Sequence, residues 1–217
     1  MKTKVLGNIP LLNSLLRTVY FVKKEDLKQG AGVMAAAFHD DPAIRYLLSG
    51  ETTGNHDWRY FFTILQAVYG KCLILSSDQT IQNLLVMFPP HLKGVPIFRF
   101  ILNGGIGLCR FFGPKLFLRS LNYENNCQRI KGKFLTPNTW YCMCFVVRPE
   151  KQGQGIGSRL IKPVLQALDD YHIPLYLETH KEINTYIYEH LGFHMVDIST
   201  IPGTNTTQYA MLRTTKD

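Results

Sequence analysis

The sequence lacks the cysteine pattern of a disulfide-stabilised domain. It contains no C-x-x-C pair, and its five cysteines are an odd number without framework spacing: Cys72, Cys109, Cys127, Cys142 and Cys144. Small secreted domains usually carry an even number of cysteines at characteristic spacings, whereas cytosolic proteins keep their thiols reduced. We therefore expect free thiols and a cytoplasmic protein.

Long apolar runs and common ligand signatures are missing as well. The leucine-rich residues 1–16 are interrupted by Asn8, Pro10 and Asn13, no A-x-A cleavage site follows them, and Val95–Leu118 contains two arginines. A signal peptide or a membrane span needs a longer uninterrupted apolar stretch, so we expect neither. No histidines have H-E-x-x-H spacing, and no Gly-Lys-Ser/Thr completes a P-loop, so we expect no metal and no P-loop nucleotide site.

Acidic residues are scarce between Lys93 and Lys133. Glu124 is the only acid there, against eight lysines and arginines, so this segment carries 8 − 1 = +7 of a total net charge of +8. The segment is either a solvated basic face or a surface that attracts an anionic cosubstrate or an acidic substrate. No nucleic-acid recognition motif accompanies the charge, and we expect no nucleic-acid partner.

The sequence does contain a glycine-rich junction between a strand pattern and a helix pattern. The apolar run Tyr141–Val147 is followed by alternating glycines at 153, 155 and 157, and from Leu160 onwards apolar residues recur at helical spacing. The first amides of a helix have no intrahelical acceptor, and the helix dipole adds positive potential there. A phosphate or pyrophosphate group is the expected ligand of such a junction.

The glycine spacing separates the remaining phosphate motifs. A dinucleotide fingerprint needs G-x-G-x-x-G, but its third glycine would fall on Ser158 or Leu160. The pattern Gln-x-x-Gly-x-Gly fits from Gln152 to Gly157, and a second block, Asn184-x3-Tyr188-x3-Gly-Phe, follows a short apolar strand. The i, i+4 spacing puts Asn184 and Tyr188 on one helix face. The two blocks resemble the acyl-CoA pyrophosphate loop and the second signature of the GNAT superfamily of N-acetyltransferases.

The order of the expected elements agrees with that resemblance. Strands alternate with helices and hairpins lie towards both ends, which indicates a mixed sheet in a layered α/β (α+β) fold. The resemblance implies a central, mixed, mostly antiparallel twisted sheet flanked by helices, in one domain over residues 1–217. A helical insert at about residues 92–136 precedes the central strand. The segment Ala-Ala-Phe-His-Asp-Asp-Pro, which ends at Pro42, further resembles the puromycin acetyltransferase-like branch.

The expected strands and helices can be placed by residue. Strands are predicted at 17–23, 71–76, 80–88, 141–147, 175–179, 193–199 and 207–212. Helices are predicted at 25–38, 43–48, 58–69 and 157–171, from Asn184 onwards, and over 95–122 in two pieces divided at glycines.

The resemblance also implies roles for particular residues, with acetyl-CoA as the cosubstrate. Tyr188 falls where the family has its general acid; the alternative is a core tyrosine, and Tyr186 lies on another helix face. Asn184 would bond the CoA arm or cap its helix, and Gln152 would contact the pyrophosphate or cap the turn. The expected cosubstrate-binding residues are Phe145, Val146, Val147, Gln152, Gly153, Gln154, Gly155, Ile156, Gly157, Ser158 and Asn184.

The general base is left open by the sequence. The predicted central strand holds no carboxylate, so Glu178 on the next strand is the best candidate, with Tyr176 and His180 on its face by period two. The carboxylates and imidazole of His39-Asp40-Asp41 are alternatives, as is a water chain. Cys144 is not expected to carry an acyl group, because no base is paired with it.

Two functions follow from this reading. The first is an acetyl-CoA-dependent N-acetyltransferase that moves an acetyl group directly to a primary amine of a small molecule, acting as a monomer or homodimer without a nucleic-acid or membrane partner. The second is a non-catalytic acyl-CoA-binding or sensing protein of the same fold. Tyr188 favours the enzyme, because a sensor needs no proton donor. A nucleotide-binding oxidoreductase is disfavoured by the glycine spacing.

Overall fold

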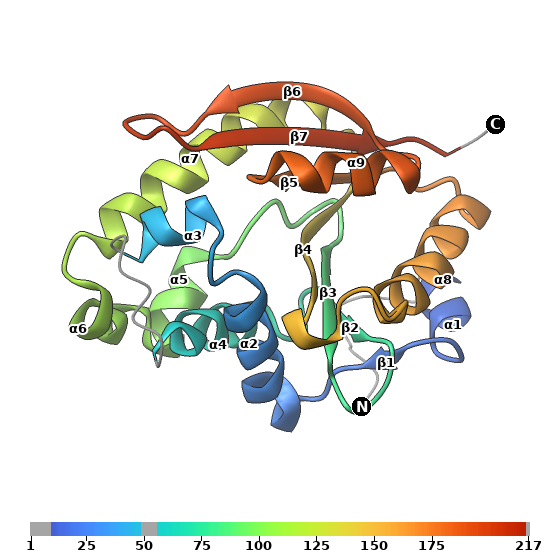
Figure 1. The fold of residues 1–217 in the computed structure, drawn as a ribbon, viewed down its shortest axis with the longest axis horizontal. Helices are drawn as coiled ribbons and strands as arrows, with labels where there is room; N and C mark the ends of the chain where they lie inside the picture. The colour runs from blue at the N-terminus through green and yellow to red at the C-terminus, as the bar shows by residue number, and fades with distance from the viewer. Residues whose placement is uncertain (1–9, 49–55, 216–217) are drawn as a thin grey trace.

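A seven-stranded mixed sheet organises the computed structural model, which describes residues 10–48 and 56–215 (Figure 1). The strand order is β1-β2-β3-β4-β5-β7-β6. β4 and β5 run parallel, and the other neighbouring strands pair antiparallel. The predicted mixed, mostly antiparallel sheet is therefore confirmed. The strands are β1 (Tyr20–Phe21), β2 (Leu73–Ser76), β3 (Asn83–Phe88), β4 (Trp140–Val147), β5 (Leu175–Thr179), β6 (His194–Thr200) and β7 (Thr207–Arg213).

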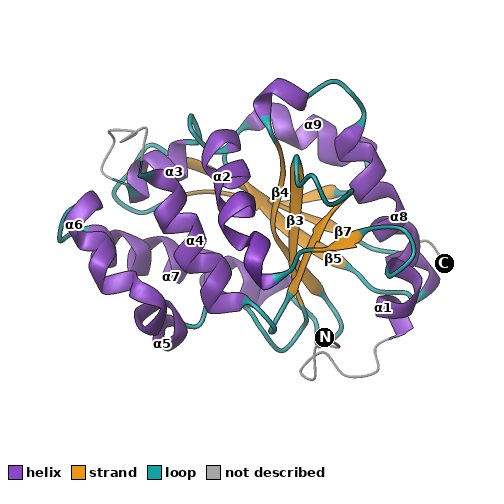
Figure 2. Cartoon of the chain, turned by 90° about the horizontal axis from the view of Figure 1, so that it is seen from below, coloured by secondary structure: helices purple, strands orange, loops and turns teal. Residues whose placement is uncertain are grey.

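Helices cover both faces of this sheet, as Figure 2 shows. One buried cluster joins the sheet to α2, α3, α4 and α7, and a second joins the opposite face to α1 and α8. β2 and β3 are buried at every position, as expected for strands covered on both sides. The helices are α1 (Pro10–Leu15), α2 (Leu27–Ala37), α3 (Pro42–Leu47), α4 (Asp57–Val68), α5 (Ile97–Phe100), α6 (Cys109–Phe112), α7 (Leu116–Phe134), α8 (Ile156–Asp170) and α9 (Glu182–His190).

Several local predictions are confirmed to within a few residues. β2 and β3 form the predicted hairpin, and β5 has the predicted bounds. In α8 the apolar positions at helical spacing, from Leu160 to Leu168, are buried. Pro42 opens α3, and the Asp41 carboxylate caps the helix by accepting hydrogen bonds from its first free amides.

One predicted element near the N-terminus differs from the structure. The first strand is much shorter than residues 17–23, because α1 and its terminal turn, in which the Thr18 and Val19 amides bond the Leu15 carbonyl, extend almost to β1. The N-terminal residues 1–16, where the sequence predicts no signal peptide, lie partly outside the described residues, because the description begins at residue 10.

The segment before β4 is helical but more divided than predicted. Gly104 and Gly113 have φ of +101° and +78°, values that side chains rarely adopt, and each ends a short helical piece. After Gly113 the chain forms one helix, α7, of 19 residues that continues beyond the predicted end at Asn122. Within the described residues, no helix is both long enough and apolar enough to cross a bilayer.

Candidate active site

The central strands β4 and β5 separate halfway along the sheet. Their parallel ladder joins Trp140–Cys142 to Leu175–Leu177. Residues 144–147 of β4 pair with β3 on one edge, Met143 lies at a register shift, and no described strand pairs with the other edge of residues 143–147. Backbone N–H and C=O groups along that edge need partners, and an extended ligand can supply them.

The glycine loop follows directly from the open edge of β4. Gly153 and Gly155 have φ of +73° and +74°, and a Cβ on either would meet no atom within 4 Å. Gly155 caps α8, whose first turn leaves its amides unpaired within the helix. A Cβ at Gly157 would lie 3.1 Å from Cγ2 of Val147, so this glycine permits close packing of α8 on β4. The loop is thus open to solvent and adjoins the strand end.

Side-chain amides fix the shape of this loop. Gln152 donates a hydrogen bond to the Val147 carbonyl at 3.3 Å, which is the turn-capping role that the sequence left open. Gln154 donates similarly to the Glu150 carbonyl at 3.0 Å. The buried amide of Asn83 donates to the Ile156 carbonyl at 2.8 Å and so ties β3 to the start of α8. Sequence reasoning missed Asn83, although a polar residue in a wholly buried strand was a usable signal.

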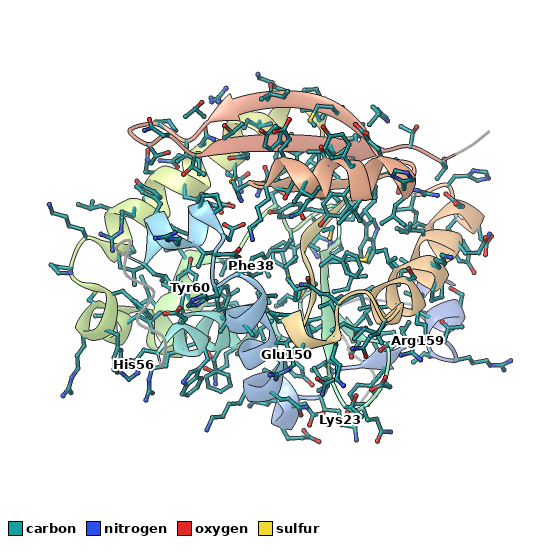
Figure 3. All side chains as sticks on the ribbon, viewed as in Figure 1. Lys23, Phe38, His56, Tyr60, Glu150 and Arg159 are labelled. Atoms are coloured by element: carbon teal, nitrogen blue, oxygen red, sulfur yellow. The ribbon has the colours of Figure 1, made fainter. Side chains whose placement is uncertain are left out.

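Charged side chains border the loop on both sides. Glu150 lies in the turn before it and Arg159 in the first turn of α8, and both are exposed (Figure 3). Ser158 is exposed too, so Arg159 adds an exposed cation beside it in the first turn of α8. The sequence did not single out Arg159.

A pocket of about 240 Å³ opens where β4 and β5 separate. Four of the predicted site residues line it, namely Phe145, Glu178, Asn184 and Tyr188. The side chains of Val146, Val147 and residues 152–158 do not line it; that of Val146 packs in the core on the side of α2. The predicted residues therefore fall into a backbone group on β4 and the loop, and a side-chain group in the pocket.

Glu178 accepts hydrogen bonds from two tyrosines at the point where β5 separates from β4. The Tyr141 hydroxyl donates to Oε2 and the Tyr176 hydroxyl donates to Oε1, each at 3.0 Å. Tyr176 lies on the predicted strand face, whereas Tyr141 comes from the neighbouring strand and was not anticipated. Burial raises the pKa of Glu178, while Lys131 and the two hydroxyls act in the opposite direction. A carboxyl group with a raised pKa is suited to accept a proton near neutral pH.

Lys131 is a buried cation that the sequence gave no reason to single out. Its side chain is 1% exposed, and its ammonium donates to the Lys93 carbonyl at 3.0 Å. The same nitrogen lies 3.8 Å from Oε1 of Glu124 and 4.1 Å from the ring centre of Tyr141. In the sequence it is one of eight cations in the basic segment, and nothing local marks it as different.

His180 and Asp41 form a second polar group in the pocket. Nδ1 of His180 lies 3.8 Å from Oδ1 of Asp41, and its Nε2 lies 3.5 Å from the Tyr123 hydroxyl. Burial lowers the pKa of His180, and the nearby Asp41 carboxylate opposes that shift. The imidazole is therefore mostly neutral at neutral pH and can accept a proton.

The other candidates from the His39-Asp40-Asp41 segment lie away from the pocket. His39 and Asp40 are exposed, and neither lines it. The Asp40 carboxylate pairs with the Lys181 ammonium at 2.5 Å, and this contact lowers the pKa of Asp40. Of the three residues, Asp41 alone faces the site.

Asn184 and Tyr188 lie on the pocket side of α9. The Asn184 amide donates to Oγ1 of Thr179 at 3.0 Å, and α9 begins two residues earlier, so Asn184 does not cap the helix. The Tyr188 ring packs edge-on against Phe193, with 5.7 Å between ring centres. Burial raises the pKa of the Tyr188 hydroxyl, which therefore remains protonated at neutral pH. Tyr186, on another face, is 53% exposed.

The thiol of Cys144 also lines the pocket. Burial raises its pKa to about 12, so the nucleophilic thiolate is rare at neutral pH. Among residues 10–48 and 56–215, no group of three or more His, Cys, Asp or Glu side chains could hold a metal ion.

Comparison with known proteins agrees with this geometry. A family model for the acetyltransferase (GNAT) domain matches residues 122–195, which contain β4, the glycine loop, α8, β5 and α9. An uncharacterized N-acetyltransferase of Schizosaccharomyces pombe is 29% identical over 186 residues, covering 79% of this chain and 72% of the relative.

Solved structures share the fold at lower identity. A histone acetyltransferase HPA2 and related acetyltransferase from Corynebacterium glutamicum superposes with a TM-score of 0.61 at 18% identity, covering 92% of this chain and 97% of that one. A polyamine N-acetyltransferase of Drosophila melanogaster gives 0.54 at 14%, covering 90% and 98%. Residues 122–195 thus match the GNAT acetyltransferase domain, and together with the similarity to the curated N-acetyltransferase and the shared fold this match supports an acyltransferase enzyme.

Proposed function

We propose that this protein transfers the acetyl group of acetyl-CoA directly to a primary amine of a small molecule. The observation that carries the proposal is the separation of β4 from β5, which places a pocket containing Glu178 and Tyr188 beside the glycine loop. Phe145 links the two parts, because it lines the pocket and its Cζ lies 3.4 Å from the Cβ position of Gly157. Residues 1–217 then act as one domain, with the helical insert at 92–136 forming part of the acceptor side.

The cosubstrate is bound chiefly by backbone groups in this proposal. The pantetheine arm lies along the open edge of β4 at Phe145, Val146 and Val147, where no described strand pairs with the backbone groups that point away from β3. The Val147 carbonyl already accepts the Gln152 amide. The pyrophosphate takes the amides of residues 154–158 at the N-terminus of α8, where the helix dipole favours negative charge. Asn184, which lines the pocket, bonds the arm in this proposal.

The chemistry needs one proton acceptor and one proton donor. The neutral amine attacks the thioester carbonyl carbon, so that a C–N bond forms and the C–S bond breaks. Glu178 takes the proton that the amine nitrogen loses, and Tyr188 gives its proton to the departing CoA thiolate. Both groups line the same pocket. Burial keeps the Tyr188 hydroxyl protonated near neutral pH, and Lys131 and the two tyrosine hydroxyls favour the carboxylate form of Glu178 against the effect of burial on its pKa. His180 beside Asp41, or a water chain, is the alternative base.

The non-catalytic acyl-CoA sensor remains the second candidate. A sensor requires the open edge of β4 and the glycine loop, but not a tyrosine-bound carboxyl group in the same pocket. The Glu178 carboxyl group, which accepts hydrogen bonds from Tyr141 and Tyr176, therefore favours the enzyme, as does Tyr188.

The five free cysteines, four of them buried, agree with a reducing compartment such as the cytoplasm.

Membership of the puromycin acetyltransferase-like branch is a further part of the proposal. Its support is the segment around Asp41 and Pro42, which forms the capped start of α3 at the pocket. The solved structures do not select an acceptor. One is described as a polyamine N-acetyltransferase and another, from Escherichia coli, as a ribosomal-protein-S18-alanine N-acetyltransferase.

Amine-dependent thiol release from acetyl-CoA tests the proposal. Purified protein is incubated with acetyl-CoA and each of a panel of amines, and the acetylated product is identified by mass spectrometry. We expect thiol release that requires both the protein and one class of amine. CoA binding by calorimetry without turnover on any amine class would instead support the sensor, and absence of CoA binding would overturn both.

A further inference from the structure

The pocket continues from the catalytic groups into a wall of aromatic and aliphatic side chains. Phe38 and Phe61 stack with ring centres 5.6 Å apart, and Tyr60 meets Phe61 edge-on at 5.5 Å and Phe100 at 6.3 Å. Figure 3 shows Phe38 and Tyr60 on the side of the molecule that carries α2 and α4. These rings come from elements outside the residues matched by the acetyltransferase family model.

The helical insert closes the pocket from the other side. Val95, Ile97 and Phe117 line it, and all three belong to the segment between β3 and β4. The Arg99 guanidinium donates to the carbonyls of Ala67 and Tyr69, which ties this wall to the end of α4. The insert is therefore an integral part of the acceptor pocket.

The carboxylates in the pocket already have partners. Glu178 accepts hydrogen bonds from two tyrosines, and Asp41 accepts them from the Ala43 and Ile44 amides at the start of α3. Glu124 accepts one from the Gln128 amide at 2.6 Å and lies 3.8 Å from the Lys131 ammonium. Lys131 adds a buried positive charge to the same pocket. These three carboxyl groups outnumber the one lysine, so this end of the pocket attracts the amine of an acceptor, and the apolar walls are left for the rest of its body.

We propose that the acceptor is a monoamine with a hydrophobic body, of the arylalkylamine or branched alkylamine class, because the wall of the pocket beyond these charged groups is aromatic and aliphatic. This inference rests on the proposed function. The amine lies near Glu178 and His180, and its apolar body fills the space between the aromatic wall and the insert. A pocket of about 240 Å³ suits a body of one or two rings. Apolar walls with a few polar groups that orient the ligand are typical of such sites.

An acceptor panel tests the inference directly. The kcat/KM for acetyl transfer is compared among phenylethylamine, isoamylamine, spermidine, an amino-sugar fragment of an aminoglycoside and a peptide with an N-terminal alanine. We expect the two apolar monoamines to exceed the others by at least about tenfold, because a hydrophobic pocket discriminates by this order for each apolar group that it binds. Equal or better turnover of spermidine, the fragment or the peptide would overturn the acceptor class while leaving acetyl transfer intact. CoA binding without thiol release from any amine would overturn the proposed function itself.

Two neighbouring exposed residues on α7 allow a residue of the pocket wall to be compared with a residue of the surface. Phe117 lines the pocket and is 39% exposed, whereas its neighbour Leu118 is 65% exposed and does not line it. We expect Phe117→Ala to raise the KM for phenylethylamine about fivefold or more without changing CoA affinity, and Leu118→Ala to change neither. An unchanged KM in Phe117→Ala, or an equal rise in both variants, would contradict the proposed wall.

Discussion

The two sides of the candidate site are built in different ways. The cosubstrate side is one continuous stretch, from the open edge of β4 through the glycine loop into α8, within residues 140–170. The acceptor side is assembled from residues as far apart as Met34 and Tyr188. Backbone groups are enough to bind a cosubstrate that does not change, so a short sequence motif can encode that side of the site. Side chains must shape a pocket for one acceptor, and only the fold brings them together.

Among the changes that test this comparison, replacing the proposed base should have the largest effect, and it should act on kcat. Glu178→Gln keeps the shape of the side chain and can still bond Tyr141 and Tyr176, but it cannot accept the amine proton. We expect kcat to fall about 10³-fold with little change in CoA affinity, within the usual range for acid–base catalysis. Activity near that of the wild type would transfer the role to His180 or to water.

The same variant has a predicted pH signature in stability. The pKa of Glu178 is raised in the folded protein, so its contribution is fully present below the unfolded pKa and is lost as pH rises through the folded pKa. As pH rises above about 4, the usual pKa of a glutamate in the unfolded chain, the free energy of unfolding should therefore fall more in the wild type than in Glu178→Gln. Urea unfolding at several pH values measures this. Parallel curves for the two proteins would contradict the raised pKa.

Removal of the proposed acid should have the next largest effect. Tyr188→Phe keeps the ring against Phe193 and removes the hydroxyl, so kcat should fall about 10²-fold while CoA affinity and thermal stability change little. Tyr186→Phe, two residues away on an exposed face, is the matched control and should retain full turnover. A tyrosine with only a packing role would leave kcat nearly intact in both variants.

A negative charge in the glycine loop should lower the affinity for CoA without changing the acceptor side. Gly155→Asp puts a carboxylate at the proposed pyrophosphate site, and Gly155→Asn has nearly the same shape without the charge. Because both residues tolerate positive φ better than most, backbone strain affects them similarly. We expect CoA affinity to fall at least about tenfold in Asp, equivalent to about 1.4 kcal/mol, and clearly less in Asn. Equal CoA affinity in the two variants would remove the electrostatic part of the assignment.

The basic segment should give the smallest effect. Arg99 and Arg119 bond backbone carbonyls and Lys131 is buried, which leaves the exposed cations Lys93, Arg110, Lys115, Arg129 and Lys133 to act at a distance. If they steer CoA, its association should slow several-fold as the Debye length shortens from about 30 Å to about 8 Å. Stopped-flow binding at rising ionic strength measures this, and a constant rate would identify a solvated face.

The sequence predicted the strand, glycine loop and helix of the proposed cosubstrate side because their signals are local. Alternating glycines and helical spacing after Leu160 depend on neighbours in the chain, and α8 follows the glycine loop as expected. The i, i+4 spacing of Asn184 and Tyr188 on α9 is local in the same way, although both side chains line the pocket. The sheet class followed from the order of strands and helices for the same reason.

The acceptor side could not be predicted in the same way. The bonds from Tyr141 to Glu178 depend on the parallel register of β4 and β5, and Lys131 is buried only because α7 packs across the sheet. The aromatic wall joins helices separated by tens of residues. Such contacts are set by tertiary packing, which no short motif records.

Amide hydrogen exchange with and without CoA tests the central claim most directly, because it needs no variant and reads the backbone itself. We predict that CoA slows exchange in peptides spanning 143–147 and 153–158, where backbone groups are open, and leaves the insert peptides spanning 97–121 unchanged. Unaltered exchange at 143–158 in CoA-saturated protein, or protection confined to the insert, would contradict the assignment of the cosubstrate to the open edge of β4 and the glycine loop.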